Sequence, residues 1–211
     1  MKTDALIGVL AQDTKVPERI AARLIAAAAS CLALTGTVGL LILGIRPDLG
    51  QAMTAPITAM KWLIPLAVGS TGLLGALRLT RPERRGMGVV GIVAAIGVGG
   101  TLWLAAALLA TPEGQVAAAI MGNSAFRCLL ALSLIGLPPL LAMLALLRNG
   151  ASTAPGRSGA LAGLGAGGLA AAIYALHCDE DAPQFFLIWY SLGIALLSVC
   201  GAAMGRRVLR W

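Results

Sequence analysis

Charged residues are scarce in this chain of 211 residues. Asp, Glu, Lys and Arg together make up 12% of the sequence, whereas hydrophobic residues make up 58%. An ordinary soluble domain carries about 25% charged residues, so the composition excludes a typical soluble fold. Histidine occurs once, cysteine four times, and aromatic residues account for only 4%.

Sequence motifs of the common enzyme classes are also missing. The chain has no glycine-rich nucleotide-binding loop, no zinc-protease helix motif and no serine nucleophile elbow. No series of ionisable residues runs through the apolar segments, although such a series usually marks a proton or ion pathway. We therefore expect neither an enzyme nor a proton-coupled transporter, and no cofactor.

Long apolar runs are what the chain does contain. Several approach the roughly 18–20 residues needed to cross a bilayer, and we place them at about 24–45, 62–79, 88–110, 125–147, 159–176 and 185–205. They predict an all-α, polytopic membrane protein with six transmembrane helices in the region 24–205. Residues 1–23 would be an N-terminal segment without the apolar core of a signal peptide, and 206–211 a basic tail.

Glycines are concentrated in three of these runs. Small residues let helix backbones approach closely in lipid, so they predict packing seams. The pattern does not distinguish seams inside the bundle from the face of a homodimer. The glycines are Gly88, Gly91, Gly97, Gly99 and Gly100 in the third run, Gly159, Gly163 and Gly167 in the fifth, and Gly201 and Gly205 in the sixth.

The basic residues fall almost entirely on one side of the predicted bundle. Of 16 Lys and Arg residues, the N-terminus, the 78–87 and 148–158 loops and the C-terminus hold 13, which leaves three (16 − 13) for the other side: Arg46, Lys61 and Arg127. By the positive-inside rule both termini are cytoplasmic. The net positive charge is then explained by membrane lipids, and direct binding of nucleic acid is not expected.

The N-terminal segment contains an apolar stripe. Leu6, Val9 and Leu10 follow helical i, i+3, i+4 spacing, with Ile7 beside them and Asp4 elsewhere on the turn. Two interpretations stay open: an interfacial helix that leads into the first span, or a helix that docks a cytoplasmic partner.

Two cysteines stand at the predicted outer ends of spans. Cys128 begins the fourth run and Cys178 follows the fifth, so both would face the oxidising compartment at the same depth. A disulfide or a shared ligand is plausible there, and Arg127 beside Cys128 would favour the thiolate. A static disulfide that staples two helical hairpins is the alternative. Cys31 and Cys200 lie within spans, where a thiol usually packs as a small apolar group.

The segment around Cys178 concentrates polar chemistry. His177 precedes Cys178, and three acidic residues, Asp179–Asp181, follow it. His177, Cys178 and Cys128 could bind a thiophilic metal ion, which would then act as a signal. A lone histidine at a helix end is as readily a cap or an interfacial residue. Trp189 and Tyr190, one turn into the last span, are typical of residues that anchor a helix at the membrane interface.

Several of these segments resemble the NrsF-like family of six-helix membrane proteins that negatively regulate a sigma factor. The resemblance spans essentially the whole chain and is most specific in its last fifty residues. It rests on the stretches 1–7, 127–128, 147–151 with 154–155, 159–164, 174–178 and 185–190.

The resemblance implies an anti-sigma factor of the bacterial inner membrane. Its cytoplasmic side would hold an extracytoplasmic-function (ECF) sigma factor, and an outer pair of cysteines would take part in sensing a thiol, metal or redox signal. On this chain the pair is Cys128 and Cys178. The inhibitory segment would surround Asp4, Leu6, Ile7 and Leu10, together with the basic inner loops.

Two other classes of function stay in view. A membrane thiol oxidoreductase or metal transporter would need a CxxC motif or a polar line through the bundle, and the sequence contains neither. A purely structural scaffold would make the N-terminal segment irrelevant to transcription.

Overall fold

The computed structural model describes residue 3 and the ranges 20–79, 87–150, 152 and 154–209. Six long helices form its body, and two short helices and one 3-10 turn connect them. The long helices are α2 (Ile20–Leu43), α4 (Pro56–Arg78), α5 (Met87–Leu109), α7 (Ala125–Leu147), α8 (Pro155–Tyr174) and α9 (Pro183–Val208). The short elements are α3 (Leu49–Thr54), η1 (Glu113–Gln115) and α6 (Val116–Met121). The described part of the chain contains no strand, which agrees with the all-α prediction.

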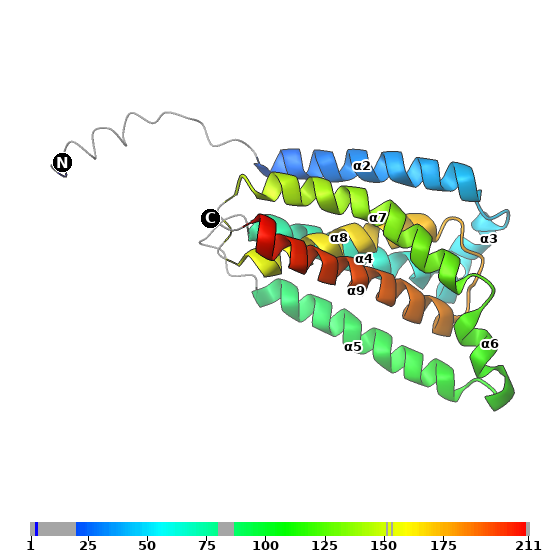
Figure 1. The fold of residues 1–211 in the computed structure, drawn as a ribbon. Helices are drawn as coiled ribbons and strands as arrows, with labels where there is room; N and C mark the ends of the chain where they lie inside the picture. Colours follow the sequence, from blue (N-terminus) through cyan, green and yellow to red (C-terminus); the bar gives the residue numbers. More distant parts are fainter. Residues whose placement is uncertain (1–2, 4–19, 80–86, 151, 153, 210–211) are drawn as a thin grey trace.

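The helices lie side by side as one elongated bundle (Figure 1). The start of α2 and the end of α9 lie at one end, here called the terminal end. The short helices α3 and α6 and the connector between α8 and α9, residues 175–182, lie at the opposite end, here called the loop end.

Helix α8 is the central element. It packs against α9, α4, α7 and α2, and twelve of its residues are buried. Its glycines make the closest approaches, as predicted. A Cβ atom on Gly159 or Gly163 would overlap the backbone of α9 at Gly201 or Leu197, and one on Gly168 would lie 2.5 Å from the backbone nitrogen of Gly69 in α4. Two glycine seams therefore hold α8 between α4 and α9.

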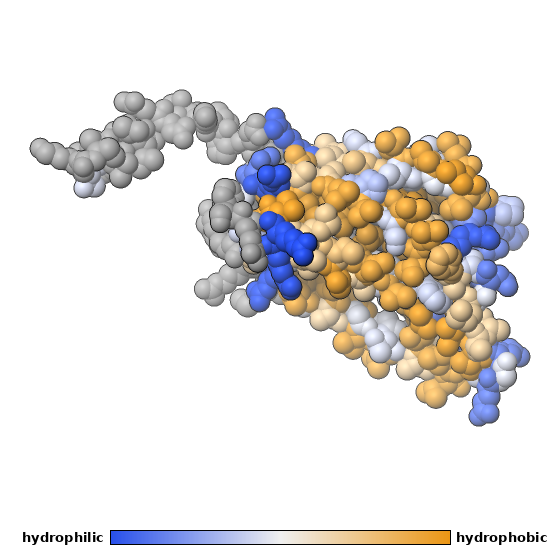
Figure 2. Space-filling model, in the orientation of Figure 1, coloured by the Kyte–Doolittle hydropathy of each residue, from blue (hydrophilic) through white to orange (hydrophobic). Residues whose placement is uncertain are grey.

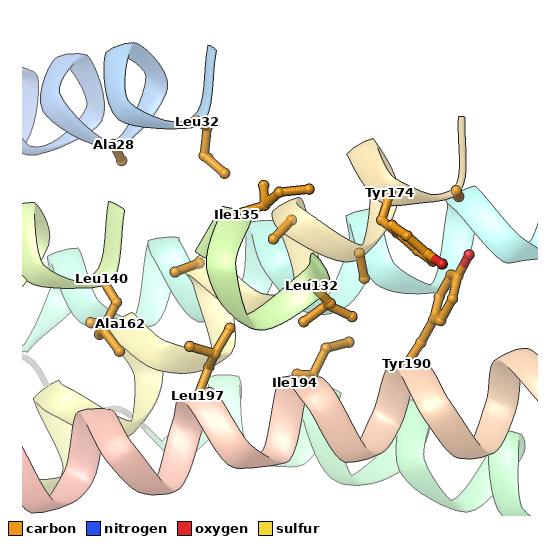
Figure 3. Close-up of a cluster of buried hydrophobic side chains, with 14 of the residues drawn as sticks. Ala28, Leu32, Leu132, Ile135, Leu140, Ala162, Tyr174, Tyr190, Ile194 and Leu197 are labelled. Atoms are coloured by element: carbon orange, nitrogen blue, oxygen red, sulfur yellow. The ribbon is translucent and has the colours of Figure 1, made fainter. Parts of the chain in front are cut away.

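The core fills the space between these backbones with aliphatic side chains. Figure 3 shows Leu32 from α2, Leu132 and Ile135 from α7, and Ile194 and Leu197 from α9 converging along the bundle. Leu132 is fully buried and Leu197 is 2% exposed. The cluster extends to Tyr174 and Tyr190 at the loop end, where the chemistry of the interior changes from aliphatic to polar.

The outer surface is apolar between the two ends of the bundle (Figure 2). Large side chains such as Leu41, Leu102 and Leu109 are 80%, 67% and 89% exposed. Such a surface is stable in lipid but not in water. Among the described residues, α2, α4, α5, α9 and the segment Glu113–Leu147, which contains α7, have the length and hydropathy of membrane spans. Helix α8 is long enough but does not qualify as a sixth span, so the six-span topology and the position of the termini stay predictions.

The glycines of α5 do not form the predicted seam within this chain. A Cβ atom on Gly88, Gly91, Gly97 or Gly99 would meet nothing within 4 Å, and Gly100 has one distant neighbour. The reason is that α5 packs at the edge of the bundle, where its main neighbours are α4 and α9. The alternative role of these glycines, as the face of a homodimer, stays a prediction.

The stretch between the first two predicted spans is largely helical. Helix α3 covers Leu49–Thr54, and α4 begins at Pro56, before the start of about 62 that we predicted for the second span. Proline at the first helical position is favourable because its missing N–H would have no partner there. Lys61 consequently lies inside a helix, more than one turn from its start.

A matched pair of glycine substitutions tests the seams. We expect Gly163→Ala to lower the free energy of unfolding by about 1–3 kcal/mol, because the added methyl group overpacks the α8–α9 contact. Gly91→Ala should be neutral or slightly stabilising, because its Cβ atom meets nothing. Thermal unfolding of both variants in the same detergent measures the difference, and equal effects would contradict the close approach.

Candidate functional site

The α8–α9 connector makes three hydrogen bonds to two neighbouring parts of the chain at the loop end. The backbone N–H of Arg46 donates to Leu176 O at 3.0 Å, and His177 Nδ1 donates to Gly44 O at 3.0 Å. Glu180 Oε1 accepts from the backbone N–H of Asn123 at 2.6 Å. The connector therefore holds the end of α2 on one side and the start of α7 on the other.

Arg46 makes the densest set of contacts in the site. Its Nη1 and Nη2 donate to the two carboxylate oxygens of Asp181 at 2.7 and 2.8 Å. Its Nε and Nη2 donate to Asp48 at 2.8 Å each. Nη1 also donates to Cys178 O at 3.1 Å, so all five N–H donors of the guanidinium are used.

Lys61 reaches the same two acceptors from α4. Its Nζ donates to Cys178 O at 2.7 Å and to Asp181 Oδ1 at 3.0 Å, and the residue is fully buried. An unpaired ammonium group in such a place would cost several kcal/mol. Arg46, Lys61, Asp48 and Asp181 form what we call the ion network, in which two cations face two carboxylates.

The network shifts the pKa values of Arg46, Asp48 and Asp181 toward their charged forms. Hydrogen bonds to Asp181 and Asp48 raise the pKa of Arg46 above its ordinary value. Its hydrogen bond to Arg46 lowers the pKa of Asp48 to about 2. Burial alone would raise the pKa of Asp181, but its hydrogen bonds to Arg46 and Lys61 and their charges outweigh burial and lower it. Both carboxylates therefore stay ionised throughout the physiological pH range.

Cys128, in the first turn of α7, and Cys178, in the connector, both lie in the core of the bundle, and their pairing stays a prediction. Cys128 is fully buried and Cys178 is 2% exposed, both belong to the same hydrophobic core cluster, and both are free thiols. The backbone of Cys178 is at the same time the shared acceptor of Arg46 and Lys61, so one residue carries both the thiol and a contact of the ion network.

Two tyrosines surround the thiols. The rings of Tyr174 and Tyr190 meet edge to face, 6.0 Å between centroids, and Figure 3 shows their hydroxyl groups pointing toward each other. Both hydroxyl groups are buried, and neither has a hydrogen-bond partner among the described residues. Tyr190 is 2% exposed, so the predicted role as an interfacial anchor is wrong. Trp189 is half-buried and donates to Ile120 O at 2.8 Å.

A cavity of about 230 Å³, here called the mouth cavity, reaches Cys178 from the outside. Its polar lining includes Arg46, Ser124, Arg127, His177 and Asp179. In the described part of the chain, four buried polar side-chain atoms lack a hydrogen-bond partner: Trp62 Nε1, Ser124 Oγ, Tyr174 Oη and Tyr190 Oη. Two of them belong to residues that line the mouth cavity, which is therefore equipped for a polar ligand.

The structure does not assemble the predicted metal site from His177, Cys178 and Cys128. Within the described ranges, no three His, Cys, Asp or Glu side chains converge on a position that could hold a metal ion. The ring of His177 bonds instead to the carbonyl of Gly44, just past the end of α2. The histidine thus has the capping role that the sequence left open.

The ion network was not predicted from the sequence, and Arg127 was wrongly expected to be the cation beside the Cys128 thiol. Arg127 is exposed whereas Cys128 is fully buried, because successive helical residues point about 100° apart. The buried cation near the thiols is Lys61. The available signal was charge pairing at equal depth: Arg46, Lys61 and Asp181 lie at the predicted outer ends of different spans, where opposite charges can meet.

These features define the class as an α-helical membrane protein whose loop end is closed by an ion network and two free thiols. The family described as "NrsF: Negative regulator of sigma F" matches residues 10–211. The chain belongs to this family.

Two curated relatives align with this chain over the full length of both proteins. The "Anti-sigma-F factor NrsF" of Caulobacter vibrioides is 37% identical over 226 residues. The "Probable anti-sigma-F factor NrsF" of Azospira oryzae is 34% identical over 217 residues. Both names describe regulatory proteins and not enzymes. No solved structure matches the chain.

Neutralising Asp181 tests the ion network. We expect Asp181→Asn to lower the free energy of unfolding at pH 7 by about 2 kcal/mol, because Arg46 and Lys61 then stay buried without their shared carboxylate. The expected loss is below the ~3–5 kcal/mol of a fully buried pair because the Asp181 side chain is 34% exposed. Glu113→Gln, an isosteric change at an exposed carboxylate, is the control. Denaturant titration in detergent should separate the two variants.

Proposed function

We propose that this chain is an anti-sigma factor of the bacterial inner membrane that binds an ECF sigma factor at the terminal end and releases it when the Cys128–Cys178 pair reacts at the loop end. Family membership supports the regulatory role, as do the names of both relatives. The positive-inside rule supports a cytoplasmic terminal end. The segment around Asp4, Leu6, Ile7 and Leu10 is the proposed sigma-binding element; it lies outside the described residues.

The observation that carries the proposal is the double role of Cys178. Its side chain is one of the two buried thiols, and its carbonyl oxygen accepts hydrogen bonds from Arg46 and Lys61. Arg46 follows the last turn of α2, and α2 begins at Ile20, so it includes the last four residues of the predicted N-terminal segment 1–23. A displacement of Cys178 therefore acts on α2 and α4 at the loop end, and α2 carries it toward the terminal end.

The reaction is the formation of a disulfide. Cys128 and Cys178 each lose one proton and one electron, a sulfur–sulfur bond forms, and an oxidant of the peroxide class takes up both electrons and both protons to give two water molecules. The mouth cavity gives such an oxidant access to Cys178. Because the bond fixes the sulfurs about 2.05 Å apart, the connector must adjust its position relative to α7.

The energy required is modest. A ~100-fold weakening of the sigma factor's binding corresponds to about 2.7 kcal/mol of coupling between the two ends. The bundle has two arrangements in equilibrium. Oxidation can shift this equilibrium only by the difference between the free energies of disulfide formation in the two arrangements. Loss of contacts in the ion network is of the required size.

Paired cysteine variants test the sensing step. We expect the double variant Cys128→Ser, Cys178→Ser to keep the sigma factor bound after peroxide treatment, because no disulfide can form. Cys31→Ser, Cys200→Ser should release it like the unmodified chain, because these half-buried thiols pack within α2 and α9. Co-purification of the sigma factor with and without peroxide gives the readout. Normal release from the first variant would rule out the thiol mechanism.

Introducing charges into the apolar stripe of the N-terminal segment tests the binding step separately. Leu6→Asp with Leu10→Asp should reduce the retained sigma factor about tenfold or more without oxidant, since it removes the apolar stripe. Gln12→Asp adds one negative charge in the same segment and is the control. If the stripe variant retained the sigma factor fully, the binding site would lie elsewhere on the chain.

A further inference from the structure

A second hollow adjoins the mouth cavity at the outer surface of the bundle. It is a groove of about 530 Å³ between α2 and α7, which lie side by side in Figure 1. Leu43 and Arg127 line both the groove and the mouth cavity. The two hollows therefore adjoin at the end of α2, with Arg127 between them.

The groove has the form and chemistry of a site for a hydrocarbon chain. Leu34, Val38 and Ile42 line it from α2 at intervals of four residues, so it follows the helix axis for about 12 Å. Leu130 and Leu134 face them from α7. Ile42 and Leu134 are 77% and 61% exposed, which places the groove on the apolar outer surface of the bundle.

The polar groups of the mouth cavity complement a zwitterion. Arg46 is already neutralised by Asp48 and Asp181. Arg127 and Asp179, both exposed, make no ion pair with any residue that the structure describes, and Ser124 Oγ is buried without a partner. One uncommitted cation, one uncommitted carboxylate and one unpaired hydroxyl thus line the same cavity.

We propose that the α2–α7 groove and the mouth cavity together bind one phospholipid with an ammonium headgroup, that is, a phosphatidylethanolamine. Its phosphate lies at Arg127 and Ser124, its ammonium group at Asp179, and one acyl chain occupies the groove. Charge-assisted hydrogen bonds to the phosphate and ammonium group fix the headgroup, and van der Waals contacts with the groove hold the acyl chain. An anionic phospholipid lacks the ammonium group and places its charge near Asp179, and a free phosphate ion gains nothing from the groove.

Native mass spectrometry of the full chain in detergent tests the site. The chain is mixed with equal amounts of phosphatidylethanolamine and phosphatidylglycerol, and the retained lipid is counted. We expect one phosphatidylethanolamine per chain, retained about tenfold less by Arg127→Gln, which removes the phosphate's cationic partner. Ala131→Phe, which fills the groove, should lower retention similarly, and Asp179→Asn should abolish the preference over phosphatidylglycerol.

Matched controls separate the site from general lipid adhesion. Arg148→Gln removes an exposed arginine just past the opposite end of α7, and Ala105→Phe adds the same bulk on the exposed surface of α5. Both should retain lipid normally. Val38→Trp fills the groove from α2 if Ala131→Phe does not fold.

Three results would overturn the proposal. The first is retention of phosphatidylethanolamine that neither Arg127→Gln nor a groove-filling variant reduces. The second is equal or stronger retention of phosphatidylglycerol by the unmodified chain. The third is displacement of the lipid by inorganic phosphate, with groove-filling variants unaffected, because the cavity would then hold a free anion.

Discussion

The shared carboxylate of Asp181 is the contact on which the loop end depends. It neutralises Arg46 and Lys61, two cations whose side chains are 2% and 0% exposed at the end of an otherwise apolar bundle. Without it, both charges would have to be solvated, and the end of α2 and the start of α4 would separate from the connector. The network therefore stabilises the fold only in one arrangement, which is the property that a two-state element requires.

Close packing of α8 determines where this network can form. Because glycines let α8 lie directly against the backbones of α4 and α9, the connector that follows α8 emerges in the middle of the loop end. Lys61 from α4 and Arg46 from the end of α2 can then reach the same carbonyl oxygen, that of Cys178. The mouth cavity opens on the side of α2 and α7, so a ligand or oxidant meets Cys178 beside the ion network.

The sequence predicted the six long helices well because helix length in lipid is set by apolar length, a local property. The run predicted at 125–147 matches α7 residue for residue. The α8–α9 seam was also predictable, since glycines at four-residue spacing serve close contact between helices. The pairing of Cys128 and Cys178, inferred from their equal depth at the ends of neighbouring runs, stays a prediction.

The incorrect predictions concern contacts with neighbouring elements, which no local sequence pattern specifies. Lys61 and Tyr190 have the residue types and positions of interfacial anchors, yet both are buried, Lys61 against the connector and Tyr190 against Tyr174. The glycines of α5 resemble those of α8, but α5 lies at the edge of the bundle and meets no backbone there. The predicted metal site does not form for a similar reason, because His177 Nδ1 donates a hydrogen bond to Gly44 O instead.

The central claim is that the state of the two thiols reaches α2 through the carbonyl of Cys178. Hydrogen–deuterium exchange, measured by mass spectrometry on the Cys31→Ser, Cys200→Ser background, tests it directly. Once the mass shows the loss of two hydrogens at Cys128 and Cys178, amides in residues 44–49 should exchange faster, starting with Arg46, whose N–H donates to Leu176 O in the reduced chain. Unchanged exchange in that segment, with the disulfide fully formed, would contradict the account.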